Sequence, residues 1–200
     1  MLQLQFLFKL QLNHCFYLDR ISDNVLMMQV KKGDLDKMGL LFGRYHHALF
    51  NFLFQMCNHK ESSEDMVQQV FFRMLKYRNT FLGDGEFKTW MYHLARNVLY
   101  DHFKKNKRHT GHYSIEEVEE KIGSDFFTGA ALEKKQELKT LSMAMDRLND
   151  DDRELLILCR YQQLSYREIA RILDITEASV KVRVHRALNQ LKISFLRIAN

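Results

Sequence analysis

The chain contains no proline and only three cysteines among its 200 residues. Because proline interrupts helices, its absence favours a chain that is almost entirely helical. Cys15, Cys57 and Cys159 lie far apart and form no CxxC pair. This spacing excludes a disulfide framework and a thiolate zinc site, and it indicates a reducing compartment. We therefore expect a cytoplasmic protein with no metal site.

Long apolar runs and catalytic motifs are also missing. No run approaches the ~20 apolar residues of a membrane span, so we expect none. No glycine-rich phosphate loop, metal-ligand spacing or catalytic triad is visible, so an enzyme is not expected, and neither is a cofactor. The net charge of +5 and the isoelectric point near 9.0 suit a polyanionic partner without proving one.

The first residues have a pattern of their own. Residues 2–12 alternate between apolar and polar side chains, a strand pattern in an otherwise helical chain. They lack the basic start and unbroken apolar core of a signal peptide. We interpret residues 1–22 as a non-native or mis-assigned extension and expect the functional protein to start near Met27. N-terminal sequencing of protein made from its own promoter tests this, and a mature start at Met1 contradicts it.

Helical periodicity divides the rest of the chain into two parts. The first part contains expected helices at 23–31, 36–56, 64–77 and 87–105, with Ser22 or Asp23 capping the first and Ser63 the third. Residues 109–139 combine glycines, scattered acids and weak periodicity, which are typical of a linker. Helices resume at 140–148 and 152–162. We predict an all-α fold with two small helical domains, 23–108 and 140–197, joined by a flexible linker.

Residues 165–190 have the pattern of a helix-turn-helix. Ser165 and Glu168 have the spacing of a capping box, and Thr176 can cap the second helix after a turn at 174–175. An aliphatic stripe on the second helix leaves an outward face of polar and basic residues, which fits the major groove of DNA. The alternative is an ordinary helical hairpin with a solvated face. The small Ala170, the short turn and the basic excess favour DNA binding.

Residues 85–108 interleave aromatic and basic side chains. Basic groups follow phosphates, and aromatic rings can hold unstacked bases. The alternative for Phe87 and Trp90 is a place in the core, which we favour for both. The alternative for the basic cluster is a solvated helix end suited to the helix dipole.

A third segment, residues 62–81, carries an amphipathic helix. Acidic residues lie in its first turn, and Gln68, Gln69, Arg73 and Lys76 are polar positions on a largely apolar helix. Such a helix can dock a partner. From the residues alone, packing within its own bundle is the favoured interpretation.

Together and in this order, the three segments resemble the sigma-70 superfamily, specifically the small extracytoplasmic function sigma factors. EDMVQQVFFRMLKY resembles the region 2 helix that binds the clamp helices of core RNA polymerase. GEFKTWMYHLARNVLYDHFKK resembles the segment that melts and reads the −10 promoter element. SYREIARILDITEASVKVRVHRAL resembles the region 4 helix-turn-helix that reads the −35 element. The resemblance implies an alternative sigma factor whose partners are core RNA polymerase and promoter DNA, and it leaves open whether an anti-sigma factor holds it.

The resemblance also implies roles for single residues, in three groups. For polymerase binding these are Glu64, Asp65, Gln68 and Arg73. For the −10 strand they are Phe81, Leu82, Trp90 and Asn97, together with the loop at 84–85. The basic cluster itself adds Lys88, Arg96, Lys104 and Lys105 as candidates for the phosphates of that strand. For the −35 duplex they are Thr176, Glu177, Ser179, Lys181, Arg183 and Arg186.

The chain departs from the family pattern at two positions. Asn149 follows Leu148 where the family often has proline, and the turn carries Asp174 where the family often has glycine or asparagine. If the turn requires a positive φ, aspartate can adopt it at modest cost.

The rival function is a stand-alone helix-turn-helix transcriptional regulator that binds duplex operator DNA without polymerase. Residues 85–108 argue against it, because a duplex reader needs no single-strand site.

Overall fold

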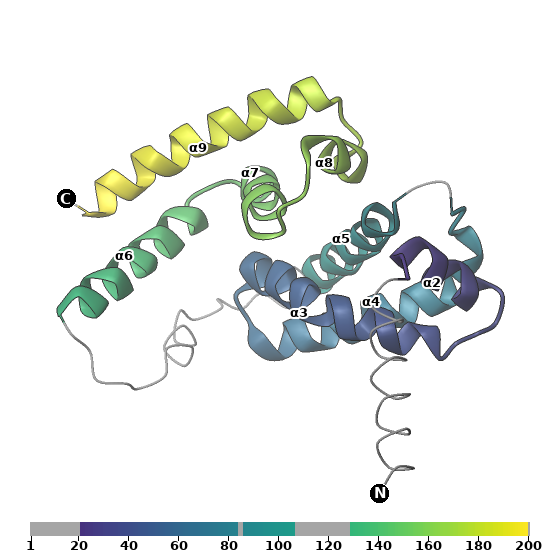
Figure 1. Ribbon diagram of the computed structural model, residues 1–200. Helices are drawn as coiled ribbons and strands as arrows, with labels where there is room; N and C mark the ends of the chain where they lie inside the picture. The colour runs from purple at the N-terminus through teal and green to yellow at the C-terminus, as the bar shows by residue number, and fades with distance from the viewer. Residues whose placement is uncertain (1–20, 84–85, 107–128, 200) are drawn as a thin grey trace, which may run out of the picture.

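The computed structural model describes residues 21–83, 86–106 and 129–199, and all regular structure in these ranges is helical (Figure 1). The first half contains α2 (Asp23–Lys31), α3 (Lys37–Cys57), α4 (Lys60–Lys76), the short η1 (Arg78–Thr80) and α5 (Phe87–Asn106). The second half contains α6 (Gly129–Asp146), α7 (Asp150–Leu156), the π-helical η3 (Ile157–Tyr161), α8 (Tyr166–Leu173) and α9 (Glu177–Ala199). The predicted all-α class is confirmed. The alternating segment at 2–12 and most of the predicted linker lie outside the described residues.

Helices α2 to α5 pack into one bundle, in which α4 lies between α3 and α5. On α3, the buried residues recur every three or four positions, from Leu41 through Tyr45, Leu49 and Phe52 to Met56. This spacing gives the helix one apolar face, and burying that face supplies most of its stability.

Helix α2 buries Leu26, Met27 and Val30 in the bundle, and polar side chains that precede Met27 add contacts. The guanidinium of Arg44 donates to Asp23 at 2.6 Å, and the backbone N–H of Phe87 donates to the side-chain oxygen of Asn24 at 2.8 Å. Asn24 therefore satisfies a free N–H at the start of α5, a helix more than sixty positions away in sequence. A chain that began at Met27 would lack both contacts.

Of the four N-caps predicted above, Ser22, Ser165 and Thr176 are confirmed and Ser63 is wrong, and Asn149 adds a cap at the start of α7. Ser22, Asn149, Ser165 and Thr176 each accept a backbone N–H three residues on, and Ser165 and Glu168 form the full capping box. Ser63 was predicted to cap the third helix, but α4 begins at Lys60 and is capped by the ring of His59. Ser63 is fully buried inside the helix, and its hydroxyl donates to the carbonyl of His59 at 2.7 Å.

Helix α9 is the long element of the second half, and α6, α7 and α8 pack along it. Val180, Val184 and Ala187 form its buried stripe. Asp174 ends α8 with a φ of 54°, which is the left-handed conformation. The turn therefore does require a positive φ, and aspartate adopts it as expected. Residues 129–139, assigned to the linker from sequence, belong to α6, because this stretch is rich in strong helix formers such as alanine, glutamate and lysine.

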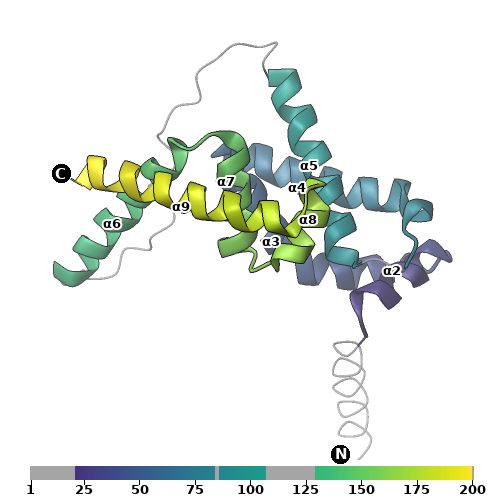
Figure 2. The ribbon, with the colours of Figure 1, turned by 90° about the horizontal axis from the view of Figure 1, so that it is seen from above.

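The two halves pack against each other rather than standing apart. Helix α5 contacts α8, and α3 contacts α7 and η3 (Figure 2). The buried apolar residues of both halves form one continuous cluster. Sequence periodicity predicted two units, but it contained no signal for this interface.

Candidate nucleic-acid interface

The predicted DNA-reading residues lie at the N-cap and in the first turns of helix α9, on either side of its buried stripe. Thr176, Glu177, Ser179, Lys181 and Arg186 are all exposed, whereas Arg183 is partly buried. The hydroxyl of Thr176 accepts the N–H of Ser179 at 3.1 Å, so Thr176 also fixes where the helix begins. The buried stripe holds α9 on α7 and α8, and the polar face remains available for a ligand.

Helix α5 carries the predicted −10 residues in two different environments. Lys88, Asn97, Lys104 and Lys105 are exposed. Trp90 is partly buried, and its indole N–H donates to Thr80 at 3.3 Å. The exposed lysines can contact the phosphates of a nucleic acid.

A hollow of about 370 Å³ lies beside the start of α5. It is lined by Phe81, Leu82, Trp90, His93 and, from α8 of the other half, Arg171, together with Thr80, Glu86 and Thr89. The loop at 84–85, predicted to help hold a flipped base, lies outside the described residues.

Phe81 and Leu82 differ sharply within this hollow. Phe81 is 2% exposed and packs its ring against Trp90 at a centroid distance of 5.3 Å, whereas Leu82 is 73% exposed. Phe81 therefore belongs mainly to the core, although it borders the hollow. Phe87 is buried as well, as the favoured core interpretation predicted.

Helix α4 exposes Glu64, Asp65 and Gln68, the predicted polymerase-contacting residues. Arg73, the fourth of this group, is partly buried, and its guanidinium pairs with Asp101 of α5 at 2.6 Å. Arg73 therefore ties α4 to α5 in the described structure.

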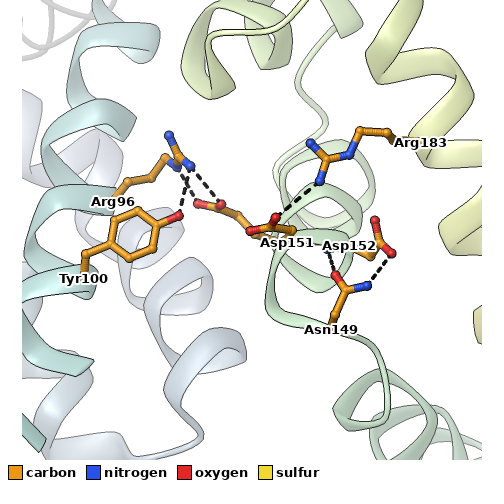
Figure 3. Close-up of polar contacts among 7 residues, drawn as sticks. Arg96, Tyr100, Asn149, Asp151, Asp152 and Arg183 are labelled. Carbon is orange, nitrogen blue, oxygen red and sulfur yellow. Dashed lines mark hydrogen bonds and ion pairs between the residues drawn. The ribbon is translucent and has the colours of Figure 1, made fainter. Parts of the chain in front are cut away.

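Arg96 of α5 is the exception among the predicted DNA residues, because the second half of the chain holds it. Its Nε and Nη2 donate to the two carboxylate oxygens of Glu154 on α7 at 2.7 and 3.2 Å. Its Nη1 donates to the carbonyl of Ile172 at the end of α8 at 2.8 Å, and Nη2 also meets the hydroxyl of Tyr100 at 3.1 Å. Figure 3 shows Arg96 and Arg183 reaching α7 from opposite sides.

The electrostatics of this contact are those of a partly buried ion pair. Burial raises the pKa of Glu154 above its ordinary range, although the charge and hydrogen bonds of Arg96 oppose the rise. Burial by itself lowers the pKa of Arg96, but the hydrogen bond and charge of Glu154 outweigh it, so that this pKa lies above its usual value. Removing either partner leaves the other charge uncompensated, which is costly in a buried position.

Sequence reasoning missed the residues that join the two halves. Besides Glu154, the hydroxyl of Tyr92 donates to Gln162 at 2.8 Å, and Arg153 donates to the carbonyl of Met56 at 3.2 Å. One signal was available, because Glu154 directly precedes the apolar run 155–158 and is one of the two buried polar residues among those described. The partners of these groups could not be inferred from the sequence, because they lie 58 to 97 positions away along the chain.

Comparison with known proteins identifies the two halves. A family model described as "Sigma-70 region 2" matches residues 41–109, and one described as "Sigma-70, region 4" matches residues 138–191. The chain is 31% identical over 157 residues to the ECF RNA polymerase sigma factor SigX of Bacillus subtilis, covering 76% of this chain and 80% of that protein. The chain belongs to the extracytoplasmic function (ECF) sigma factors of the sigma-70 family.

Other relatives agree with this assignment. The ECF RNA polymerase sigma-E factor of Escherichia coli is 27% identical over 179 residues, 84% of this chain and 92% of that protein. Two solved structures support the fold, each with a TM-score of 0.63. CnrH in complex with the cytosolic domain of CnrY is 22% identical and covers 86% of this chain and 95% of its own, and RpoE with the anti-sigma factor NepR from Bartonella quintana is 23% identical and covers 81% and 98%.

This ECF sigma factor is therefore a transcription initiation factor that acts with core RNA polymerase on promoter DNA, and it is not an enzyme. The stand-alone regulator is set aside, because a separate region 2 match accompanies the region 4 match. Within the described ranges, no helix is long and apolar enough to cross a membrane.

Proposed function

We propose that this ECF sigma factor grips its promoter at two sites, with residues of α9 on the −35 duplex and residues of α5 on the melted −10 strand. The single observation that carries the proposal is that one chain exposes polar and basic residues in the first turns of α9 and also exposes lysines on α5, which borders an aromatic-lined hollow. Duplex reading alone needs only the first of these.

On the −35 side, Lys181, Arg183 and Arg186 supply the positive charge of the α9 face. Arginine can donate two hydrogen bonds to the edge of guanine in the major groove. Thr176 and Ser179 lie at the start of the helix, where free N–H groups favour phosphate oxygens.

On the −10 side, Lys88, Lys104 and Lys105 follow the backbone of the melted strand, and Leu82, Trp90 and Asn97 surround an extruded base. Pulling a base from the stack costs a few kcal/mol, which a shaped pocket and base-edge contacts can offset. Phe81 acts beneath this site by supporting Trp90.

On α4, we assign the polymerase contact to Glu64, Asp65 and Gln68, whose side chains are exposed. The two solved relatives were captured with the cytosolic domain of CnrY and with an anti-sigma factor, so we include an anti-sigma factor among the partners to test. The site of action is the cytoplasm, where RNA polymerase works.

Arg183→Ala tests the −35 assignment. Loss of a guanine or phosphate contact should weaken binding to the −35 duplex by about 1–3 kcal/mol. The matched control is Lys192→Ala, which removes one positive charge from an exposed position further along the same helix. In vitro transcription with purified core polymerase on a genomic library first identifies the dependent promoters, and duplex affinity is then measured on them at matched salt.

The two variants give distinguishable results. If Arg183→Ala loses affinity and Lys192→Ala stays near the parent, the contact at Arg183 is specific. If both variants lose the same small amount of duplex affinity, Arg183 contributes only its general positive charge, and its assignment to a specific −35 contact is refuted. The absence of any polymerase-dependent start site would overturn the proposed function as a whole.

A further inference from the structure

One face of helix α2 meets the segment 81–87, which leads from η1 into α5. Asn24, Met28 and Lys31 are spaced four and three positions apart, so they lie on the same side of α2. All three are partly buried, whereas Met27 and Val30 on the neighbouring face are fully buried in the bundle. The core therefore fixes α2 in place, and its second face is turned to the segment 81–87.

Two residues of this face hold the beginning of the segment. The ammonium group of Lys31 donates to the backbone carbonyl of Phe81 at 2.6 Å. Met28 packs against Gly83 so closely that a Cβ at position 83 would lie 2.9 Å from the sulfur of Met28. Gly83 also has a φ of 83°, a conformation that glycine adopts without strain. The backbone at 81–83 is thus fixed both by a charged hydrogen bond and by close packing.

The third residue holds the end of the segment. The side-chain oxygen of Asn24 accepts the backbone N–H of Phe87 at 2.8 Å. Phe87 is the first residue of α5, where a backbone N–H has no partner within its own helix. Polar contacts from one short helix therefore bracket the segment at both of its ends.

Leu82 lies inside the bracketed segment. Its side chain is 73% exposed and lines the same hollow as Trp90, at the place that the proposed function assigns to an extruded base. The residues on both sides of Leu82 are the ones that α2 holds, namely Phe81 and Gly83. A binding site discriminates between ligands only where surrounding contacts keep its side chains in position. The contacts of α2 are therefore placed to determine where Leu82 meets the base.

We propose that α2 is the positioning element of the −10 site, with Lys31 and Asn24 holding the backbone of 81–87 so that Leu82 faces the extruded base. Neither anchor contacts DNA itself. Loss of an anchor lowers the discrimination between bases at the extruded position, and it leaves the −35 contact and the polymerase contact intact. This inference rests on the role of Leu82 in the proposed function.

Three substitutions at two adjacent positions test the anchor at Lys31. Lys31→Met keeps the length of the side chain and removes the donor to Phe81, whereas Lys31→Arg keeps a charged donor. The matched control is Lys32→Met, which removes the same charge from the next, exposed position. All variants are made in the full-length chain and combined with core polymerase on a promoter found by in vitro transcription.

The assay follows the extruded base directly. 2-Aminopurine is placed at each position of the −10 non-template strand in turn, and its fluorescence rises where the parent protein unstacks the base. Four promoters that differ only at that position then give the base preference, measured as the ratio of open complex on the best base to that on the other three. Affinity for the −35 duplex, its salt dependence and retention of core polymerase are measured beside it.

We expect Lys31→Met to reduce the base preference about tenfold, which corresponds to about 1.4 kcal/mol of discrimination. Lys31→Arg and Lys32→Met should stay within about twofold of the parent, since the first keeps the donor and the second removes only an exposed charge. In all three variants, −35 affinity and polymerase retention should also stay within about twofold, because α2 is assigned to neither contact.

Several results would overturn the inference. An unchanged base preference in Lys31→Met would show that the anchor is not needed, and an equal loss in Lys31→Arg would show that the donor is not the cause. An equal loss in Lys32→Met would indicate a general charge effect on the melted strand. A parallel loss of −35 affinity and polymerase retention in Lys31→Met would indicate a damaged fold in place of a displaced Leu82.

Variants at Asn24 and Leu82 keep the test decisive. If circular dichroism shows that Lys31→Met does not fold, Asn24→Ala and Asn24→Asp replace it, because aspartate keeps an acceptor for the N–H of Phe87 and alanine does not. Only Asn24→Ala should then lose base preference, and equal behaviour of the two would overturn the inference. Leu82→Ala separates the two ideas. If it loses base preference while the anchor variants keep it, the role of α2 alone fails, and if it keeps the parent's preference, the proposed base site fails and the inference falls with it.

Discussion

Replacing Phe81 by alanine should destabilise the protein far more than the same change at the adjacent Leu82. Phe81 is 2% exposed and contacts the rings of Phe87 and Trp90 at centroid distances of 6.3 and 5.3 Å. A buried phenylalanine truncated to alanine costs about 3–5 kcal/mol, from lost transfer free energy and from the cavity left behind. Since Phe81 borders a hollow that can partly relax, we expect the lower end, about 3 kcal/mol.

This cost is large relative to the net stability of a domain, which is about 5–15 kcal/mol. In a chain of this length, each kcal/mol shifts the melting temperature by about 2–4 °C, so Phe81→Ala should melt about 6–12 °C below the parent. Leu82 is 73% exposed, and its truncation should change the free energy of unfolding by no more than about 0.5 kcal/mol. Thermal melts followed by circular dichroism measure both.

A parallel functional assay separates support from contact. Permanganate footprinting of promoter melting, with core polymerase present and well below both melting temperatures, should show a defect for Leu82→Ala that its stability does not explain. If Phe81→Ala melts within about 2 °C of Leu82→Ala, Phe81 is not a core residue and the assignment from burial is wrong. If Leu82→Ala opens promoters normally, Leu82 does not contact the melted strand.

Three further predictions concern other parts of the molecule. Asp65→Lys should reduce co-purification with core polymerase by about tenfold or more without altering the fold, whereas Glu61→Lys on the same helix should not, and equal retention of both would refute the role of Asp65. Ser165→Ala removes the capping box of α8 and should lower the free energy of unfolding by about 1–2 kcal/mol, measured by urea titration; a loss below about 0.3 kcal/mol would contradict the capping energetics. Burial lowers the pKa of His93 from its ordinary 6.5, so the stability it contributes is present above that value and is lost as the pH falls through its lowered folded value. Between about pH 7.5 and pH 5, the melting temperature of the parent should therefore fall more than that of His93→Gln. The raised pKa of Glu154 has the opposite effect on stability, but both chains contain Glu154, so its effect cancels in the comparison. Equal decreases in the two chains would show that His93 does not contribute to the pH dependence.

Local features of the fold were predictable because their causes are local. The capping box at Ser165 and the left-handed turn at Asp174 each depend on side chains within a few positions. The same holds for the buried stripe of α9, which follows from apolar spacing alone. The cap of α4 was misplaced because histidine is an unusual N-cap, and Ser63 offered a more familiar one.

The arrangement of the two halves was not predictable, because its determinants are distant in sequence. Arg96 was assigned to DNA from its place in a basic segment, and its spacing gave no hint of Glu154 or Ile172. The sequence also did not predict which of two neighbouring residues is exposed. Phe81 and Leu82 are both large and apolar, yet Phe81 is buried and Leu82 is exposed. Periodicity reports which face of a helix is buried, whereas the identity of the covering element requires the three-dimensional structure.

The shared use of Arg96 affects how any substitution there must be interpreted. Its guanidinium is bonded to Glu154 and Ile172 in the free protein and is assigned to phosphate in the bound one. Arg96→Ala would destabilise both the free and the DNA-bound protein. Destabilising the free protein increases the affinity for DNA, and losing the phosphate contact decreases it, so the measured change is the difference between the two effects. A near-neutral result in the parent chain would then be compatible with a strong DNA contact. Only a double-mutant cycle with Glu154 recovers the separate contributions.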